Sequence, residues 1–361
     1  MTRVVGHLDL DYFFAQVEEV HNPSLGGLPV LVCVYSGRTE DSGVVSTANY
    51  KAREFGIKSG MSIALAKKRL KGTDARFLQL HHEMYEDTSE RIMSLLREET
   101  DAIEQTGIDE AFFDITGKSK NDFALAASTA SEIKREVLRR EKLTCSIGLG
   151  PNKVVAKLAS DFRKPDGLTV VPPQSVRSFM DPMSVDRLYG VGTKSSALLK
   201  EKGITTISDL ASADFPLLEG LFGRKIAVYF RDAANGVDDE PVREKSGITQ
   251  LSRIITLKKD SQDLNVILMQ LQPTFENLHG RVTERALVFK SISVIGILPD
   301  LSIRTRTKTL DKPTAQLSAI AENAPLLLES LLKECGELRR VGVKVADFDA
   351  KAQTSLAEFL R

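Results

Sequence analysis

The spacing of apolar residues predicts alternating strands and helices through the first part of the chain. Residues 3–10 have the pattern of a strand, and residues 82–99 and 123–142 carry apolar side chains at helical spacing. Between these two helices, residues 102–115 are typical of two short strands joined by a tight turn, and residues 144–150 are typical of a closing strand. Strand, helix, strand, strand, helix, strand is the order of a ferredoxin-like domain.

An insertion separates the first strand from the helix at 82–99. It begins with a helical segment ended by Pro23, continues with a buried strand at 28–37, and has a strand that runs into a helix at 43–56. We therefore expect the segment up to about residue 78 to interrupt the ferredoxin-like order.

The second half of the chain predicts a helical region followed by another mixed domain. Residues 171–237 are helical with glycine punctuation, and residues 238–247 are polar and typical of a linker. Residues 248–347 repeat the six-element order. Its strands are expected at 248–259, 286–298, 301–310 and 338–345, and its helices at 264–280 and 315–334. The predicted fold class is α+β, with two ferredoxin-like units.

Composition narrows the protein class without identifying a function. The chain has 361 residues, a formal net charge of zero, 42% hydrophobic and 27% charged residues, which is typical of a globular protein with two or three domains. No apolar run approaches the length of a membrane span, and the start does not resemble a signal peptide. Cys33, Cys145 and Cys335 are far apart, so we expect reduced thiols and a cytoplasmic location.

Carboxylates occur where the predicted first ferredoxin-like sheet should be apolar. Asp9 and Asp11 alternate with leucines and share a face of the strand, and Asp109 and Glu110 lie at the hairpin turn. Because the first strand neighbours that hairpin, Asp9, Asp109 and Glu110 should converge. Close carboxylates repel each other, and a pair of divalent cations such as Mg²⁺ removes that repulsion and can promote phosphoryl transfer.

Each carboxylate pair taken alone also fits turn or capping residues and a hairpin tip. Their convergence favours the metal site. We expect Asp11 to cap the following helix or to brace the site rather than to bind metal.

Basic residues give candidates for triphosphate contacts. Tyr50 and Arg53 are three residues apart on a predicted helix and share a face, as phosphate-binding side chains would. An exposed arginine beside a half-buried tyrosine is the alternative. Lys164 precedes a proline that ends a helix, where a lysine can also simply complement the helix dipole.

Other segments predict contacts with DNA or a protein partner. Gly190 and Gly192 lie between helical stretches, where glycines let backbone N–H groups approach a DNA phosphate, although a plain helix–helix turn fits equally. Two later strands carry cations, Arg304, Arg306 and Lys308 in one and Arg339, Arg340 and Lys344 in the other. The C-terminal residues Gln353, Leu356, Phe359 and Leu360 resemble a sliding-clamp-binding box, and a frayed amphipathic terminus is the alternative.

The chain resembles the Y-family DNA polymerases of the DinB, or DNA polymerase IV, branch, and the archaeal members above all. The resemblance runs from about residue 3 to 347. It is carried by DLDYFFAQVEEVHNPSLGGLPV, SGVVSTANYKAREFGIKSGM, IDEAFFDI and KVVAKLASDFRKPDG, which are long, ordered and correctly spaced.

This resemblance implies a palm, fingers, thumb and little finger. The implied bounds are 1–12 and 79–170 for the palm, 13–78 for the fingers, 171–237 for the thumb, 238–247 for a linker, 248–347 for the little finger and 348–361 for a clamp-binding tail. The thumb would contain a helix–hairpin–helix, and given the resemblance the two cationic strands should place a basic sheet face over duplex DNA.

The resemblance also implies site roles. Asp9, Asp109, Glu110 and the Leu10 carbonyl would bind two Mg²⁺ ions, for which Mn²⁺ may substitute. Phe13, Tyr50, Arg53 and Lys164 would bind the incoming nucleotide, and Phe14 would be a steric gate against a 2′-hydroxyl. The implied activity is low-fidelity translesion DNA synthesis by a monomer, using primer–template DNA and dNTPs and stimulated by a sliding clamp. No unassigned stretch is long enough for a proofreading exonuclease.

Two residues depart from the family pattern. Gly107 stands where relatives often have serine, and Tyr189 stands where they often have proline; neither change removes a chemical group from the site. Two other classes also fit parts of the sequence. A nucleotide cyclase shares a ferredoxin-like two-metal palm but needs no DNA-binding thumb, and a DNA-binding scaffold needs no convergent carboxylates.

Overall fold

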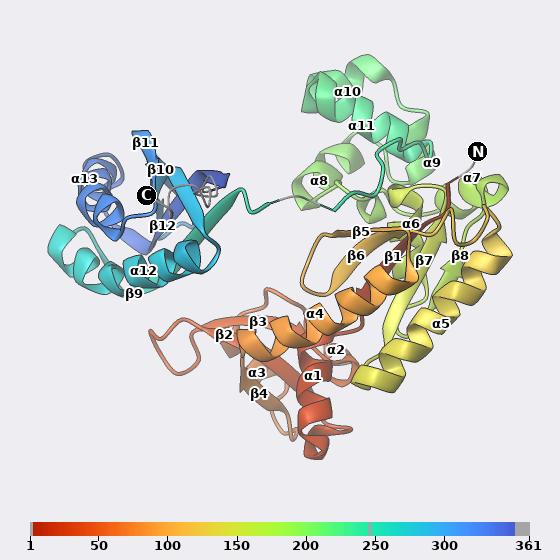
Figure 1. Ribbon diagram of the computed structural model, residues 1–361, viewed down its shortest axis with the longest axis horizontal. Helices are drawn as coiled ribbons and strands as arrows, with labels where there is room; N and C mark the ends of the chain where they lie inside the picture. Colours follow the sequence, from red (N-terminus) through yellow and green to blue (C-terminus); the bar gives the residue numbers. More distant parts are fainter. Residues whose placement is uncertain (1–2, 245–246, 351–361) are drawn as a thin grey trace, which may run out of the picture. The chain divides into compact units, whose positions relative to one another are not determined.

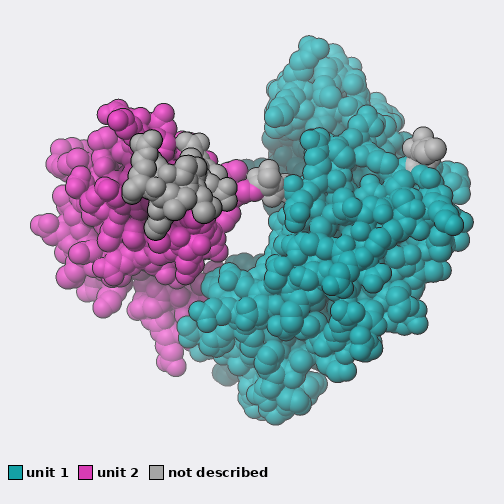
Figure 2. Space-filling view, in the orientation of Figure 1, with its two compact units in different colours: residues 1–33, 45–61, 65–245 teal, residues 34–44, 62–64, 246–361 magenta. Residues whose placement is uncertain are grey.

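The computed structural model describes residues 3–244 and 247–350. The chain forms two compact units, shown in different colours in Figure 2. The first contains Met1–Cys33, Val45–Met61 and Leu65–Lys245, and the second contains Val34–Val44, Ser62–Ala64 and Ser246–Arg361.

The palm is built on a five-stranded sheet in the order β5-β6-β1-β7-β8 (Figure 1). Its strands are β1 (Val5–Leu10), β5 (Ala102–Gln105), β6 (Glu110–Asp114), β7 (Cys145–Gly150) and β8 (Leu168–Val170). The central strand β1 runs antiparallel to β6 and β7, and β8 adds a parallel edge. The predicted ferredoxin-like order is confirmed, and β8 extends it.

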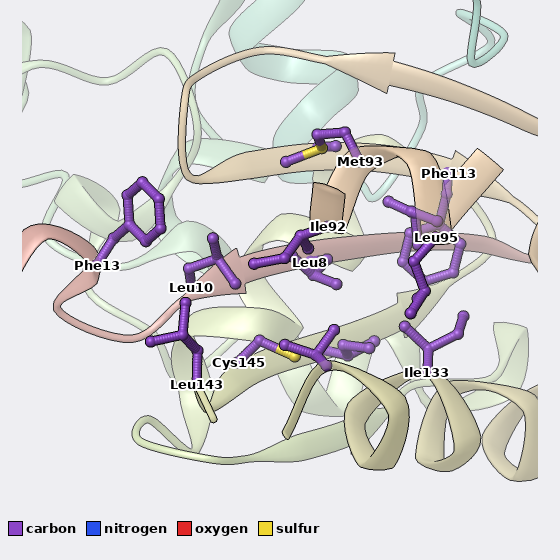
Figure 3. Close-up of a cluster of buried hydrophobic side chains, with 14 of the residues drawn as sticks. Leu8, Leu10, Phe13, Ile92, Met93, Leu95, Phe113, Ile133, Leu143 and Cys145 are labelled. Carbon is purple, nitrogen blue, oxygen red and sulfur yellow. The ribbon is translucent and has the colours of Figure 1, made fainter. Parts of the chain in front are cut away.

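Alternation along β1 sends its side chains to two different layers. Leu8 and Leu10 are buried with residues of α4 (His82–Glu99) and α5 (Phe123–Glu141), as Figure 3 shows. Val5 packs instead with Ala156 of α6 (Lys153–Phe162), and His7 also contacts α6. Because strand side chains alternate, Asp9 shares this second face.

The fingers contain α1 (Phe13–His21), β2 (Val30–Tyr35), β3 (Gly43–Ala48), α2 (Tyr50–Arg53), α3 (Ile63–Arg69) and β4 (Arg76–Gln79). Their small sheet has the order β3-β2-β4, with β2 and β4 parallel. The predicted insertion between β1 and α4 is therefore confirmed.

The thumb is helical, as its glycine-punctuated sequence predicts. It contains α7 (Val176–Met180), α8 (Thr193–Glu201), α9 (Ile207–Ala211), α10 (Phe215–Phe222) and α11 (Arg224–Ala234). Leu199, Leu210, Leu218 and Phe230 contribute to its own buried core.

The polar segment after the thumb, predicted to be a linker at 238–247, makes contacts with the palm. The Arg3 guanidinium donates hydrogen bonds to the carbonyl groups of Asp238, Asp239 and Glu240, and Val242 is buried against the palm. This segment is attached mainly through its backbone carbonyl groups. Because such contacts leave no apolar pattern in the sequence, the segment was predicted to be a linker.

The little finger repeats the palm's element order but pairs its strands differently. It contains β9 (Gln250–Ser261), α12 (Leu264–Glu284), β10 (Leu287–Ile297), β11 (Ile303–Thr314), α13 (Leu317–Cys335) and β12 (Leu338–Ala350), with sheet order β11-β10-β12-β9. In the palm, β6, the third strand of the six-element order, lies between β1 and β5, the first and second. In the little finger, β12, the fourth strand, lies between β9 and β10, the first and second. Strand β12 also continues to Ala350, beyond the predicted end of the domain.

Close packing of α6 on β7 gives a test of the palm. A Cβ at Gly148 would lie 2.2 Å from backbone atoms of Ala156 and Ser160. We expect Gly148→Ala to destabilise the protein by about 3 kcal/mol or more, because a helix must move. Gly220→Ala is the matched control, since nothing lies within 4 Å of its Cβ and alanine favours the interior of α10 by about 1 kcal/mol. Urea unfolding measures both; equal midpoints would contradict the tight contact.

Candidate active site

The three predicted carboxylates lie at one end of two neighbouring strands. Asp9, near the end of β1, is directly opposite Glu110, the first residue of β6. The N–H of Leu10 donates to the Asp109 carbonyl at 2.9 Å, which holds the hairpin turn against β1. The fold therefore places Asp9, Asp109 and Glu110 at the same end of two neighbouring strands.

Two ammonium groups face these carboxylates. Lys164 Nζ lies 2.7 Å from Asp9 Oδ1 and 2.9 Å from Asp161 Oδ1. Lys157 Nζ, from α6, lies 2.5 Å from Glu110 Oε2. The surrounding His7 and Lys157 side chains keep the pKa of Glu110 well below its usual range, against the effect of partial burial.

The pKa values of the other two carboxylates, Asp9 and Asp109, are shifted in the opposite direction. Burial raises the pKa of Asp9 to about 6, and the neighbouring Asp109 adds to this effect while Lys164 opposes it. Burial also raises the pKa of Asp109, and Glu110 contributes. In both carboxylates, burial and the neighbouring acid raise the pKa more than Lys164 lowers it.

The donor set fits hard divalent cations. Within residues 3–244 and 247–350, no three histidine, cysteine or acidic side chains are arranged around a common metal position. Asp9, Asp109 and Glu110 nevertheless lie at neighbouring strand ends, are partly buried, and carry oxygens of the type that Mg²⁺ prefers. Lysine ammonium groups supply positive charge there.

Asp11 braces the site, which is one of its two predicted roles. Its carboxylate accepts hydrogen bonds from the hydroxyl groups of Thr144 and Ser146 and from the backbone N–H of Asp166, each at 2.8 Å. It does not cap α1, since that helix has no side-chain cap. Asp11 therefore ties the end of β1 to β7 and to the loop after Lys164.

Tyr50 and Arg53 share a face, as predicted. The Arg53 guanidinium lies over the Tyr50 ring, 4.7 Å from its centroid, and Arg53 Nε donates to the Ala48 carbonyl at 2.9 Å. The Tyr50 hydroxyl is buried and has no hydrogen-bond partner among the described residues. A buried, unpartnered hydroxyl beside an arginine suits an oxygen-rich ligand.

The two aromatic residues that begin α1 have different environments. Phe13 is 2% exposed and belongs to the palm core, so its side chain cannot contact a nucleotide and only its main chain could. Phe14 is only partly buried and stacks on Tyr85 of α4 at 4.4 Å between ring centroids. The Tyr85 hydroxyl donates to Glu18 Oε1 at 2.6 Å. Tyr85 was not predicted, because only folding brings α4 beside α1.

The two thumb glycines lie in the turn that leads into α8. Gly190 has a φ of 90°, and Gly192 is the N-cap of α8 without a side-chain cap. The Tyr229 hydroxyl donates to the Tyr189 carbonyl at 2.8 Å and secures the turn. The N–H groups of the first turn of α8 therefore have no side-chain cap competing for them.

The six little-finger cations that were predicted to contact DNA do not share one face, which corrects the prediction. Arg304, Arg306 and Lys308 lie opposite Gly296, Val294 and Ile292 of β10, on the face that packs against α12 and α13. Arg306 forms an ion pair with Glu334 of α13.

The other sheet face carries two of the predicted cations among small polar side chains. Arg340 and Lys344 lie opposite Ile297 and Ser293 on this face. Their neighbours there include Ser252, Thr256, Ser291, Thr305 and Thr307. Arg339 lies at a register shift in β12. A period of two correctly grouped Arg304, Arg306 and Lys308 on one face but did not say which face the helices cover.

The predicted clamp-binding residues Gln353, Leu356, Phe359 and Leu360 lie outside the described residues. In the described part of the chain, no helix is both long and apolar enough to cross a membrane.

Comparison with known proteins identifies the family. The chain matches the impB/mucB/samB family over residues 8–161 and the C-terminal domain of the same family over residues 248–357. It is 39% identical to DNA polymerase IV of Nitrosopumilus maritimus, over 99% of each chain. It is 41% identical to DNA polymerase IV of Methanosarcina acetivorans, over 99% of this chain and all of the relative.

Solved structures agree with this assignment. A Y-family DNA polymerase chimera of Dbh and Dpo4 matches with a TM-score of 0.88 and 36% identity, over 95% of this chain and 98% of the other. An insertion ternary complex of Dbh DNA polymerase matches with a TM-score of 0.70 and 37% identity, at the same coverage. The chain therefore belongs to the impB/mucB/samB family and is a DNA polymerase of the Y family, DinB branch.

Proposed function

We propose that this polymerase copies damaged as well as intact templates, by transferring a deoxynucleotidyl group from a dNTP to the primer 3′-hydroxyl with release of pyrophosphate. The observation that carries the proposal is the group of carboxylates at the ends of β1 and β6, directly beside Lys164. No covalent enzyme intermediate is needed, because positioning and electrostatics suffice for this transfer.

Asp9, Asp109, Glu110 and the Leu10 carbonyl would hold Mg²⁺. When bound, two such ions stabilise the attacking and leaving oxygens of the displacement. Glu110 lies on the side of the attacking hydroxyl in this proposal. The raised pKa values of Asp9 and Asp109 support it, since a divalent cation would restore their ionised forms.

The triphosphate would be bound by three groups. Lys164 turns from Asp9 to a phosphate oxygen, and the unpartnered Tyr50 hydroxyl and the Arg53 guanidinium bind others. The first turn of α1 adds backbone N–H groups, since it has no side-chain cap. Phe13 contributes through its main chain, and Phe14 lies under the sugar.

An incorporation assay tests the proposal against its nearest alternative. The full chain is incubated with Mg²⁺, labelled dNTP and a primer–template, with or without an abasic site in the template. We expect extended primers and pyrophosphate on both templates. Cyclic nucleotide as the product, or extension that always stops before the abasic site, would contradict the activity or the bypass function respectively.

DNA binding should weaken steeply as the salt concentration rises. Arginine and lysine side chains that contact phosphates release counterions from the DNA, and added salt opposes that release. We expect Arg340→Ala with Lys344→Ala to reduce the slope of log affinity against log salt by about 2. Arg304→Ala with Lys308→Ala is the matched control, since these residues lie on the helix-covered face. Fluorescence anisotropy with a labelled primer–template measures both slopes. Equal slopes for the wild type and the Arg340/Lys344 variant would contradict contact through this face.

The C-terminal segment would bind a sliding clamp, and the polymerase would act as a monomer. Its Q-x-x-L-x-x-F-L pattern supplies apolar side chains for a pocket on the clamp. We expect deletion of residues 352–361 to abolish stimulation by the clamp in a primer-extension assay and to leave synthesis without the clamp unchanged. Full stimulation of the deleted protein would contradict this role.

A further inference from the structure

Both carboxylate oxygens of Glu110 have protein partners. The Thr106 hydroxyl donates to Oε1 at 3.2 Å, and the Lys157 ammonium lies 2.5 Å from Oε2. Thr106 comes from the hairpin itself, whereas Lys157 comes from α6 on the neighbouring layer. The orientation of this carboxylate is thus set from two directions.

Thr106, whose hydroxyl donates to Glu110, is followed by Gly107. A Cβ at Gly107 would lie 3.0 Å from Glu110 Cγ and 3.1 Å from Asp109 Oδ1, which is tighter than ordinary contact. A side chain at position 107 would therefore require the Glu110 and Asp109 side chains to shift.

Lys157 is itself held in place by its surroundings. Its Nζ lies 3.3 Å from His7 Nε2 and 5.7 Å from the centre of the Tyr189 ring. The Ser160 hydroxyl donates to the Lys157 carbonyl and lies 2.8 Å from His7 Nδ1. His7 Nε2 also lies 3.5 Å from Glu110 Oε2, so His7, Lys157 and Glu110 form one cluster. Tyr189, the second departure from the family pattern, covers Lys157 from the thumb.

We propose that Thr106 and Lys157 are positioning residues that hold Glu110 for the attacking primer hydroxyl, and that Lys157 also competes with divalent cations for Oε2. The inference rests on the proposed role of Glu110. It predicts an unusual combination: loss of the Lys157 charge strengthens metal binding while it slows incorporation, because Glu110 becomes more available and less well oriented. A disrupted fold would weaken both.

Lys157→Met tests the competition directly. Mn²⁺ binding to the full chain without DNA is measured by electron paramagnetic resonance, and single-turnover incorporation is measured at saturating metal. We expect about tenfold tighter Mn²⁺ binding and about tenfold slower incorporation. Lys153→Met is the matched control on the same helix, since its ammonium contacts Glu104 and Glu240 at 3.2 and 3.3 Å and should change neither quantity.

Thr106→Val tests the other oxygen without a change of size. We expect about tenfold slower incorporation with an unchanged KM for dNTP, and recovery in Thr106→Ser, which restores the hydroxyl. Unchanged rates in both Thr106→Val and Lys157→Met, or a parallel loss of Mn²⁺ binding and rate in Lys157→Met, would overturn the inference. If the wild type itself fails to extend primers, the proposed function fails instead, so the two failures are distinguishable.

Discussion

Asp109→Asn and Glu110→Gln, each made separately, abolish primer extension, with an expected loss of about a thousandfold or more in the rate of incorporation. Both substitutions keep the shape of the side chain and remove its charge. The hairpin turn is held by backbone hydrogen bonds, including that from Leu10 N–H to the Asp109 carbonyl, so the fold should persist. A single-turnover extension assay with Mg²⁺ measures the loss.

The matched control for these variants is Asp114→Asn, at the opposite end of β6. The Asp114 carboxylate accepts a hydrogen bond from the Thr116 backbone N–H at 2.8 Å and lies away from Lys157 and Lys164. We expect it to extend primers at the wild-type rate. Extension by Asp109→Asn and Glu110→Gln at that same rate would mean that the metals bind elsewhere.

Phe14→Ala should admit ribonucleotides. The Phe14 ring is partly buried and stacks on the Tyr85 ring, and the Tyr85 hydroxyl donates a hydrogen bond to Glu18. These contacts fix the position of the Phe14 ring. Without the ring, a 2′-hydroxyl no longer meets an aromatic face. We expect the ratio of ribonucleotide to deoxynucleotide incorporation, measured as relative kcat/KM, to rise by about a hundredfold.

Phe14→Tyr is the matched control, because it keeps the aromatic ring and adds only a hydroxyl group. It keeps the aromatic wall, so we expect ribonucleotides to remain excluded. If Phe14→Ala is as selective as the wild type, Phe14 is not the gate. The adjacent Phe13 cannot substitute for it, because its side chain is fully engaged in the palm core.

The sequence by itself determined the parts of the protein that depend on local periodicity and chain order. Alternation along residues 5–10 and the turn at Asp109 placed the carboxylates at neighbouring strand ends, because the ferredoxin-like order sets which strands are adjacent. The spacing of Tyr50 and Arg53 likewise predicted a shared helix face. In these cases the relevant geometry is set within a few residues or by topology alone.

Only the tertiary structure decided which layer each face meets. Lys157 reaches Glu110 because α6 packs against β1 and β7, and Tyr85 reaches Phe14 because α4 lies beside α1; these contacts join residues that are far apart in sequence. In the little finger, a period of two grouped Arg304, Arg306 and Lys308 correctly, but the packing of α12 and α13 put them on the helix-covered face. Side-chain period defines two faces of a strand, and only packing determines which of them remains open to a ligand.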